Sequence, residues 1–98
     1  MDAPYEVELT AMARSDLLAA RRWLTQPGSG LRARLRLARI SRALVELEFA
    51  PLRWSKGPFP DTRQRFVDGY TLIYRIDDAA NAVTVLRVFA PYQDRSSL

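Results

Sequence analysis

Alternation of apolar and polar positions near the start of the chain predicts a half-buried strand over residues 5–9. One face of this strand is apolar, and the other carries Glu6 and Glu8. Thr10 follows as a helix N-cap, and the loop at residues 27–30 ends the helix that it starts. Between them, one apolar stripe has helical spacing: Ala13, Leu17, Ala20 and Leu24.

A second helix is predicted from about residue 29 or 30 to about residue 49, stopped by Pro51. It carries two apolar stripes on different sides. The first stripe consists of Ala33, Leu37, Ile40, Leu44 and Leu47. The second consists of Leu31, Leu35, Ala38, Val45 and Phe49. One stripe can face the core of the domain, and the other needs either the first helix or an external partner to cover it.

The rest of the chain reads as a loop and three strands. Residues 52–61 carry a glycine and two prolines and are typical of a loop. The strands are residues 62–67, 70–77 and 83–89. Asp68-Gly69 between the first two is a two-residue hairpin signal. The last strand is apolar on both faces, which indicates a central position in the sheet. Residues 90–98 form a polar tail.

This order of elements predicts an α+β fold. An N-terminal strand, a helical hairpin and a three-stranded antiparallel meander together give a four-stranded sheet with two helices on one face. With 98 residues, the chain is one domain, residues 1–98, with a single modest core.

Composition excludes several kinds of chemistry. The sequence has no Cys and no His, which removes disulfides, thiol nucleophiles, Cys-ligated zinc and the usual near-neutral base. No metal and no cofactor are expected. No stretch of about 18 apolar residues occurs, and the first residues lack a signal peptide pattern. We therefore expect a cytoplasmic protein that does not enter a membrane.

Positive charge is concentrated in the predicted helical hairpin. The chain has a net charge of +4, and only one of its 15 cations is a lysine. The span from Leu17 to Val45 holds no acidic residue and seven arginines: Arg21, Arg22, Arg32, Arg34, Arg36, Arg39 and Arg42. Such a patch suits a polyanion or an acidic protein segment. The alternative is a solvated surface whose arginines reflect a GC-rich genome.

The same residues resemble the RelE/ParE family of bacterial toxins from type II toxin–antitoxin systems. Residues 5–17 resemble the opening strand and the Ala13-x-x-Asp16-Leu17 helix start of that family. Residues 44–51 resemble the end of its second helix. The run Arg65 to Ile76 resembles its core signature of an arginine, a tight turn and a Tyr70-x-x-x-Tyr74-Arg75 strand. Residues 83–89, followed by Asp94-Arg95, resemble its last strand and a trailing acidic-Arg pair.

This resemblance implies a growth-inhibiting toxin that a cognate antitoxin neutralises in a hetero-oligomer. ParE-like members of the family inhibit DNA gyrase, and RelE-like members cleave mRNA on the ribosome. We favour gyrase because the residues expected of a nuclease form an incomplete set. The alternative is a ribosome-dependent mRNA endonuclease, so whether the protein is an enzyme stays open.

Cleavage of RNA by its 2′-hydroxyl needs a base, an acid and cations around the phosphorus. Without histidine, the nuclease alternative depends on basic residues and one tyrosine: Lys56, Arg63, Arg65, Arg87, Tyr92 and Arg95. Lys56 is the only lysine and would serve as a base if its pKa were depressed. Two structural roles compete with catalysis. Arg65 could pair within the fold with Asp68 or Asp77, and Arg87 in a central strand needs a carboxylate partner or an opening to solvent.

Two binding surfaces are expected for a gyrase inhibitor. An acidic, amphipathic antitoxin segment would dock on the second helix, at Leu31, Arg32, Leu35, Arg36, Arg39, Arg42 and Val45. The target would contact Trp54, Arg63, Arg87 and Arg95. The first strand or residues 62–67 could also accept an added strand at an open sheet edge. A nucleic-acid-binding module is a further hypothesis, although the usual motifs of such modules are absent.

Overall fold

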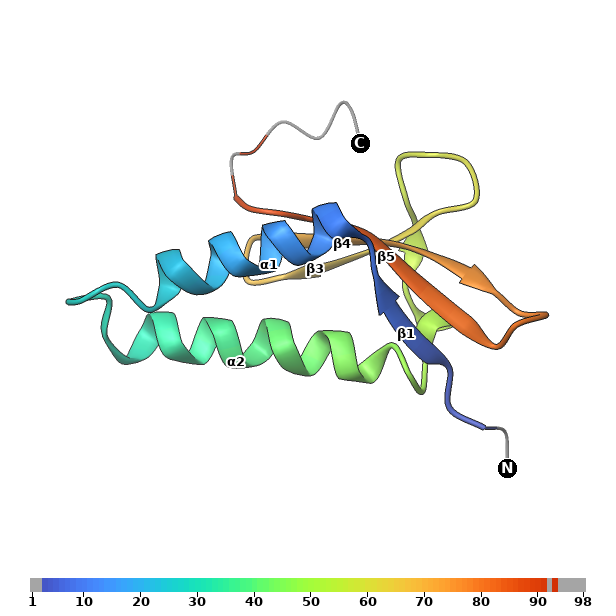
Figure 1. Ribbon diagram of the computed structural model, residues 1–98, viewed down its shortest axis with the longest axis horizontal. Helices are drawn as coiled ribbons and strands as arrows, with labels where there is room; N and C mark the ends of the chain where they lie inside the picture. Colours follow the sequence, from blue (N-terminus) through green and yellow to red (C-terminus); the bar gives the residue numbers. More distant parts are fainter. Residues whose placement is uncertain (1–2, 92, 94–98) are drawn as a thin grey trace.

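The computed structural model describes residues 3–91 and residue 93. Strand β1 (Glu6–Leu9) is followed by helices α1 (Ala11–Leu24) and α2 (Gly30–Glu46) and by a single 3-10 turn, η1 (Pro51–Arg53). Four strands complete the fold: β2 (Ser55–Lys56), β3 (Arg63–Val67), β4 (Tyr70–Asp77) and β5 (Ala82–Phe89). They form one sheet in the order β1-β5-β4-β3-β2 (Figure 1), in which only the β1–β5 pair is parallel.

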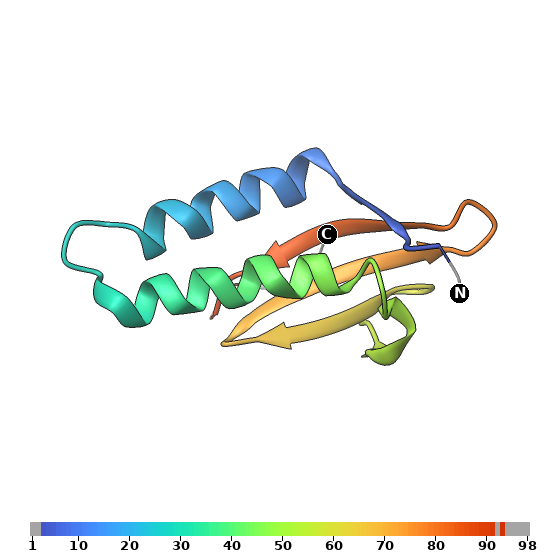
Figure 2. The ribbon, with the colours of Figure 1, turned by 90° about the horizontal axis from the view of Figure 1, so that it is seen from below.

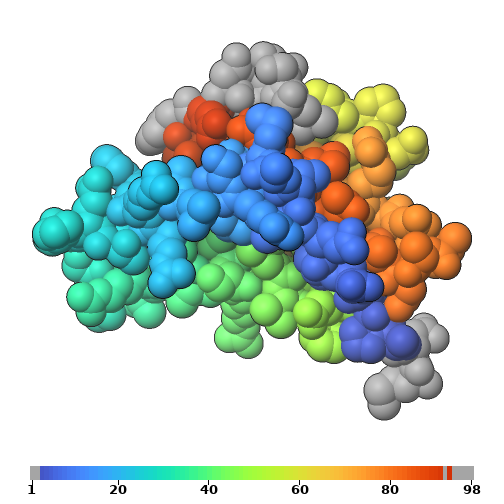
Figure 3. All heavy atoms as spheres, in the orientation of Figure 1, coloured from blue at the N-terminus to red at the C-terminus, as the bar shows by residue number. Residues whose placement is uncertain are grey.

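The two helices lie side by side on one face of the sheet, as predicted (Figure 2). Their connecting loop projects past the end of the sheet where β3 turns into β4 (Figures 1 and 2). The space-filling view shows the same tip standing out from the rest of the molecule (Figure 3). The inner surface of the hairpin near its loop is therefore not covered by the sheet.

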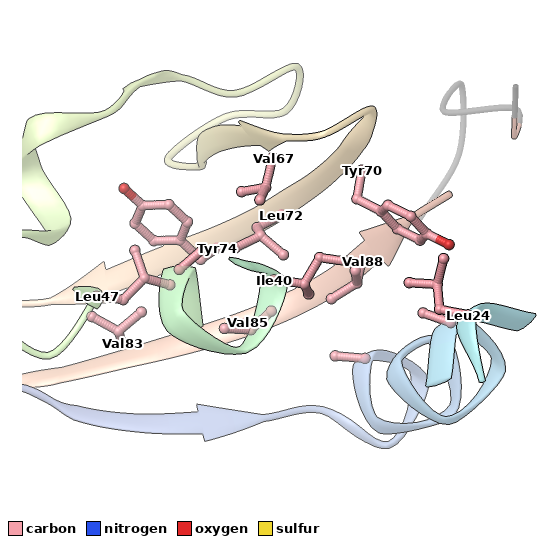
Figure 4. Close-up of a cluster of buried hydrophobic side chains, with 13 residues drawn as sticks. Leu24, Ile40, Leu47, Val67, Tyr70, Leu72, Tyr74, Val83, Val85 and Val88 are labelled. Atoms are coloured by element: carbon pink, nitrogen blue, oxygen red, sulfur yellow. The ribbon is translucent and has the colours of Figure 1, made fainter. Parts of the chain in front are cut away.

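The core lies between the helices and the sheet (Figure 4). Both predicted inward stripes supply it: Ala13, Ala20 and Leu24 from α1, Ile40 from α2 and Leu47 just after α2 are buried. The sheet contributes Val67, Tyr70, Leu72, Tyr74, Val83, Val85 and Val88. Tyr70 and Tyr74 are 2% and 0% exposed, so both are core aromatics. Burial of this apolar surface is the main stabilising contribution in a domain of this size.

Local sequence features act where they were expected. The Thr10 hydroxyl oxygen accepts a hydrogen bond from the Ala13 backbone N–H at 3.0 Å, which caps α1. Asp68 and Gly69 have φ values of 48° and 88°, the left-handed conformations that a two-residue hairpin turn requires. Val67 and Tyr70 flank this turn as a pair. Strand β5 is central between β1 and β4, as its two apolar faces predicted.

An irregularity in the β4–β5 pairing determines which β5 side chains reach the core. Ile73 pairs with Arg87, whereas its neighbour Tyr74 pairs with Val85, so Leu86 is the extra residue of a bulge. The bulge allows both Val85 and Val88 to face the helices. It leaves Arg87 on the opposite face of the sheet from them.

The structure corrects two details of the sequence prediction. The sheet has five strands, because Ser55 and Lys56, expected in a loop, pair with Gln64 and Arg63 of β3. A two-residue strand has no alternation to detect, so only its partner reveals it. Helix α2 ends at Glu46 rather than near residue 49, and the Phe49 N–H bonds to the Glu46 carbonyl in the turn that follows. Within the described part of the chain, no helix has the length and apolarity to cross a bilayer.

Candidate functional site

The second apolar stripe, which lies on α2 and in the turn after it, faces solvent and is not covered by α1. Leu31 is 70% exposed, Leu35 46%, Val45 54% and Phe49 68%. Ala38 lies between them and is also exposed. We call these five residues the outer stripe. A row of large apolar side chains in solvent is typical of an interaction surface rather than of an ordinary helix face.

Arginines border the outer stripe, and few of them are neutralised. Arg39 contacts Asp68 at 2.7 Å, and Arg42 contacts Glu46 at 3.6 Å. Both pairs are solvent-exposed on the arginine side, so they contribute little stability. Among the residues that the structure describes, no ion pair involves Arg32, Arg34 or Arg36. The surface around the outer stripe is therefore apolar and positively charged together.

Arg65 is held inside the fold by three groups. Its Nη1 lies 3.2 Å from a Glu46 carboxylate oxygen and donates to the Ala43 carbonyl at 3.3 Å. Its guanidinium stacks 4.1 Å from the centre of the Trp54 ring. The Arg65 side chain is only 14% exposed. The prediction that it pairs with Asp68 or Asp77 is wrong, because α2 brings Glu46 closer than the adjacent turns do.

Arg63 and Tyr74 fix the segment that contains η1 against the sheet. Arg63 Nη1 donates to the Trp54 carbonyl at 2.6 Å and to the Leu52 carbonyl at 3.3 Å. The Tyr74 hydroxyl donates to the Pro51 carbonyl. Burial raises the pKa of Tyr74 to about 12, although nearby arginine charges oppose the shift. This phenol stays protonated near neutral pH, so it holds the loop and does not act as a base there.

Arg87 has the carboxylate partner that a central-strand arginine needs. Its Nε and Nη2 donate to the two Asp16 oxygens at 2.8 and 3.1 Å, and the Val88 N–H donates to Asp16 at 2.8 Å. The Arg87 guanidinium also lies 4.6 Å from the Phe89 ring centre. The hydrogen bond that Arg87 donates to Asp16 raises the pKa of Arg87 more than burial lowers it. The pairing of β1 with β5 ends at Val85, and beyond that point Asp16 accepts the Val88 N–H at the edge of β5.

Lys56 differs from these arginines because it is exposed on the edge strand β2. It borders a groove of about 700 Å³ together with Phe59, Arg63 and Arg75. Lys56 pairs with Arg63, which places both side chains on the face of the sheet that also carries Arg65. Arg87 pairs with Ile73, and Ile73 pairs with Gln64. Arg87 therefore lies on the other face of the sheet, with Gln64 and Ile73.

The structure does not bring the nuclease candidates to one place. Lys56, Arg63 and Arg65 share one face of the sheet, and Arg87 occupies the other. Tyr92 and Arg95 lie outside the described residues. Of the predicted target contacts, Trp54 is half-buried beneath Arg65, and Arg63 and Arg87 are bonded within the fold. No group of three or more acidic residues suited to a metal ion occurs in residues 3–91 and 93.

Two residues with clear structural positions were missed by sequence reasoning. Asp16 was recognised only as a motif position, and its bond to Arg87 spans 71 residues, which no local pattern encodes. Trp23 is 64% exposed near the end of α1. The helical spacing of Ala20 and Leu24 already places Trp23 off the inward stripe, so its exposure could have been predicted.

Comparison with protein families gives one match over most of the chain. Residues 7–91 match the model of the ParE toxin of the type II toxin–antitoxin system parDE. No curated protein sequence is significantly similar to the chain.

Solved structures show the same fold. A chain of the chromosomal ParDE system of P. aeruginosa has a TM-score of 0.69 at 15% identity and covers 89% of this chain and 96% of its own. A chain of the toxin–antitoxin complex RelBE2 from Mycobacterium tuberculosis has a TM-score of 0.60 at 30% identity and covers 95% and 98%. The isolated RelE toxin of E. coli has a TM-score of 0.63 at 19% identity and covers 93% and 88%.

Proposed function

The chain belongs to the ParE toxin family of type II toxin–antitoxin systems, and from this membership we propose that it arrests bacterial growth by inhibiting DNA gyrase. A cognate antitoxin would neutralise it in a hetero-oligomeric complex. Gyrase is a cytoplasmic enzyme, so the toxin would act in the cytoplasm. Inhibition of this kind requires a complementary surface and no catalytic group in the toxin itself.

One observation supports gyrase over mRNA as the target of the toxin. The arginines that a nuclease would need are engaged within the fold and lie on opposite faces of the sheet. Arg65 is bonded to Glu46 and Ala43 on one face, and Arg87 is bonded to Asp16 on the other. Catalysis of phosphodiester cleavage depends on convergent, pre-organised charges around one phosphorus. A binding protein has no such requirement.

A second candidate function is ribosome-dependent cleavage of mRNA. The groove beside Lys56 favours it, because a lysine, two arginines and the half-buried Phe59 border one hollow, where the cations outnumber the aspartates Asp61 and Asp78. Cations and an aromatic ring together suit a nucleotide chain. Arg63 is the weakest member of this group, since it already donates two hydrogen bonds to backbone carbonyls. Lys56 would be the residue to test.

The outer stripe and its arginines support docking of the antitoxin on α2. The predicted contacts are Leu31, Arg32, Leu35, Arg36, Arg39, Arg42 and Val45. All but Arg36, which is half-buried, are exposed. An acidic amphipathic helix would bury its apolar side on the stripe and place its carboxylates near the arginines. The toxin alone leaves this apolar surface in water, so partner binding would also stabilise the fold.

Induced expression in a bacterium tests the proposed toxin activity. The wild-type chain, expressed alone, is expected to stop growth within a few generations. Co-expression of the protein encoded by the neighbouring gene is expected to restore growth, because the partner covers the toxin's docking surface. Colony counts measure both effects. Normal growth while soluble wild-type protein accumulates without the partner would contradict the proposal.

A further inference from the structure

An apolar hollow lies between the N-terminal segment and the turn that follows α2. Its volume is about 330 Å³, and residues 3–5 and residues 48–53 border it. Figures 1 and 2 show the start of the chain and the turn after α2 at the end of the molecule opposite the loop that joins the two helices. The hollow is therefore remote from that loop.

Hydrogen bonds hold the walls of this hollow in place. The Tyr5 N–H donates to the Glu48 carbonyl at 2.7 Å, which joins one wall to the other. The Asn81 side chain donates to the Pro4 carbonyl at 2.8 Å. Side chains of β3 and β4 hold η1 through its carbonyls. A surface with fixed walls loses little conformational entropy when a partner binds it.

The segment after α2 carries four apolar residues between two opposite charges. We call it the 48–53 segment: Glu48, Phe49, Ala50, Pro51, Leu52 and Arg53. Phe49 is 68% exposed and Leu52 55%, so both present large apolar surfaces to water. Among the residues that the structure describes, neither Glu48 nor Arg53 takes part in an ion pair. Two opposite charges without ion-pair partners thus flank one exposed apolar surface.

The charges at this hollow distinguish a second copy of the chain from other occupants. An acidic protein segment or a nucleic acid would meet Glu48 as a like charge, and a basic segment would meet Arg53. Phosphates would also leave Phe49 and Leu52 uncovered. A surface that carries both signs of charge around an apolar centre is complementary to itself, as the interface of a two-fold symmetric dimer must be.

We propose that the 48–53 segment and its hollow form a two-fold interface between two copies of this chain. Two such segments that face each other across a perpendicular two-fold axis run antiparallel. Glu48 of one copy then faces Arg53 of the other, and Phe49 packs against Leu52. Symmetry makes each contact twice. The antitoxin contacts predicted from the sequence lie within α2, before this segment, so the interface does not depend on the proposed toxin activity.

Sedimentation of the purified full chain, without antitoxin, tests this interface over about 1–200 µM protein. A small interface of this kind is expected to give a dimer that dissociates within that range. Leu52→Glu is expected to weaken dimerisation about tenfold or more, because it places a carboxylate in the apolar contact of both copies. Leu18→Glu is the matched control, since Leu18 is 56% exposed but lies on α1. It should dimerise as the wild type does.

Charge reversal supplies a second test, which a general loss of stability cannot imitate. Glu48→Arg and Arg53→Glu are each expected to weaken the dimer, since each variant brings only like charges together across the axis. A one-to-one mixture of the two variants is expected to associate about as tightly as the wild type, because opposite charges then meet at both contacts. The double variant Glu48→Arg/Arg53→Glu should dimerise for the same reason.

Several results would overturn the interface. A wild-type chain that stays monomeric up to about 200 µM would do so, as would equal dimerisation by the wild type and Leu52→Glu. A mixture of the two charge variants that associates no more tightly than either alone would contradict the antiparallel contact. If the wild type is monomeric and Leu52→Glu escapes neutralisation by the antitoxin, the hollow binds the antitoxin instead. Absence of growth arrest by the wild type would contradict the proposed function and leave these results unaffected.

Discussion

Replacing Asp16 by alanine is expected to lower the free energy of unfolding by about 3 kcal/mol, because it leaves a largely buried arginine without its counter-ion. The Arg87 and Asp16 side chains are only 11% and 13% exposed. The same carboxylate accepts the Val88 N–H, so the substitution also removes the acceptor of a β5 backbone donor. Urea denaturation of the purified variant measures the loss.

Two controls separate the effect of an unpaired buried charge from the loss of any ion pair. The double variant Asp16→Ala/Arg87→Met removes both charges and is expected to recover much of the stability, since an apolar pair of similar volume often replaces a buried ion pair well. Arg42→Ala removes an exposed pair with Glu46 and is expected to cost less than about 1 kcal/mol. A loss below about 1 kcal/mol for Asp16→Ala would show that Arg87 is not held as described.

Replacing Leu31 and Leu35 together by glutamate is expected to abolish neutralisation by the antitoxin and to leave toxicity intact. Both side chains are exposed, at 70% and 46%, so the fold should tolerate the change. Removing two apolar contacts and adding charge against an acidic partner should weaken binding about 100-fold or more. Growth with and without the co-expressed partner, and the affinity of the purified pair, measure the effect.

Leu18→Glu is the matched control for the outer stripe. Leu18 is 56% exposed on α1, outside the stripe. This variant should be toxic and should be neutralised as the wild type is. If Leu31→Glu/Leu35→Glu were neutralised equally well, the antitoxin would not bind α2. If that double variant lost toxicity, the outer stripe would contact the target.

Elements with a regular local pattern could be predicted from the sequence. The alternation in residues 5–9, the inward stripes of both helices and the Asp68-Gly69 turn each depend on spacing along the chain. The short strand β2 could not be predicted, because its two residues acquire their strand character from pairing with β3. The predicted end of α2, near residue 49, lies three residues beyond the observed end at Glu46, because the turn after Glu46 keeps helix-like hydrogen bonds.

The candidate sites were less predictable because they depend on contacts between distant elements. Arg65 was expected near Asp68 or Asp77, yet Glu46 of α2 reaches it. The sequence identified two apolar stripes on α2 but left open what covers the second. The structure shows that α1 does not cover the second stripe, because its large apolar side chains are exposed. The hollow beneath the projecting part of the hairpin is a further example, because its walls come from α1, from α2 and from one end of the β4–β5 pair.

The inhibition of gyrase is tested most directly with purified components. Relaxed plasmid, gyrase and ATP are incubated with the wild-type chain, and translating ribosomes with a defined mRNA are incubated with the same preparation. The account predicts loss of supercoiling at concentrations that leave the mRNA intact, and relief of this inhibition when the antitoxin is added. Unimpaired supercoiling together with cleaved mRNA would contradict the account and would direct attention to Lys56.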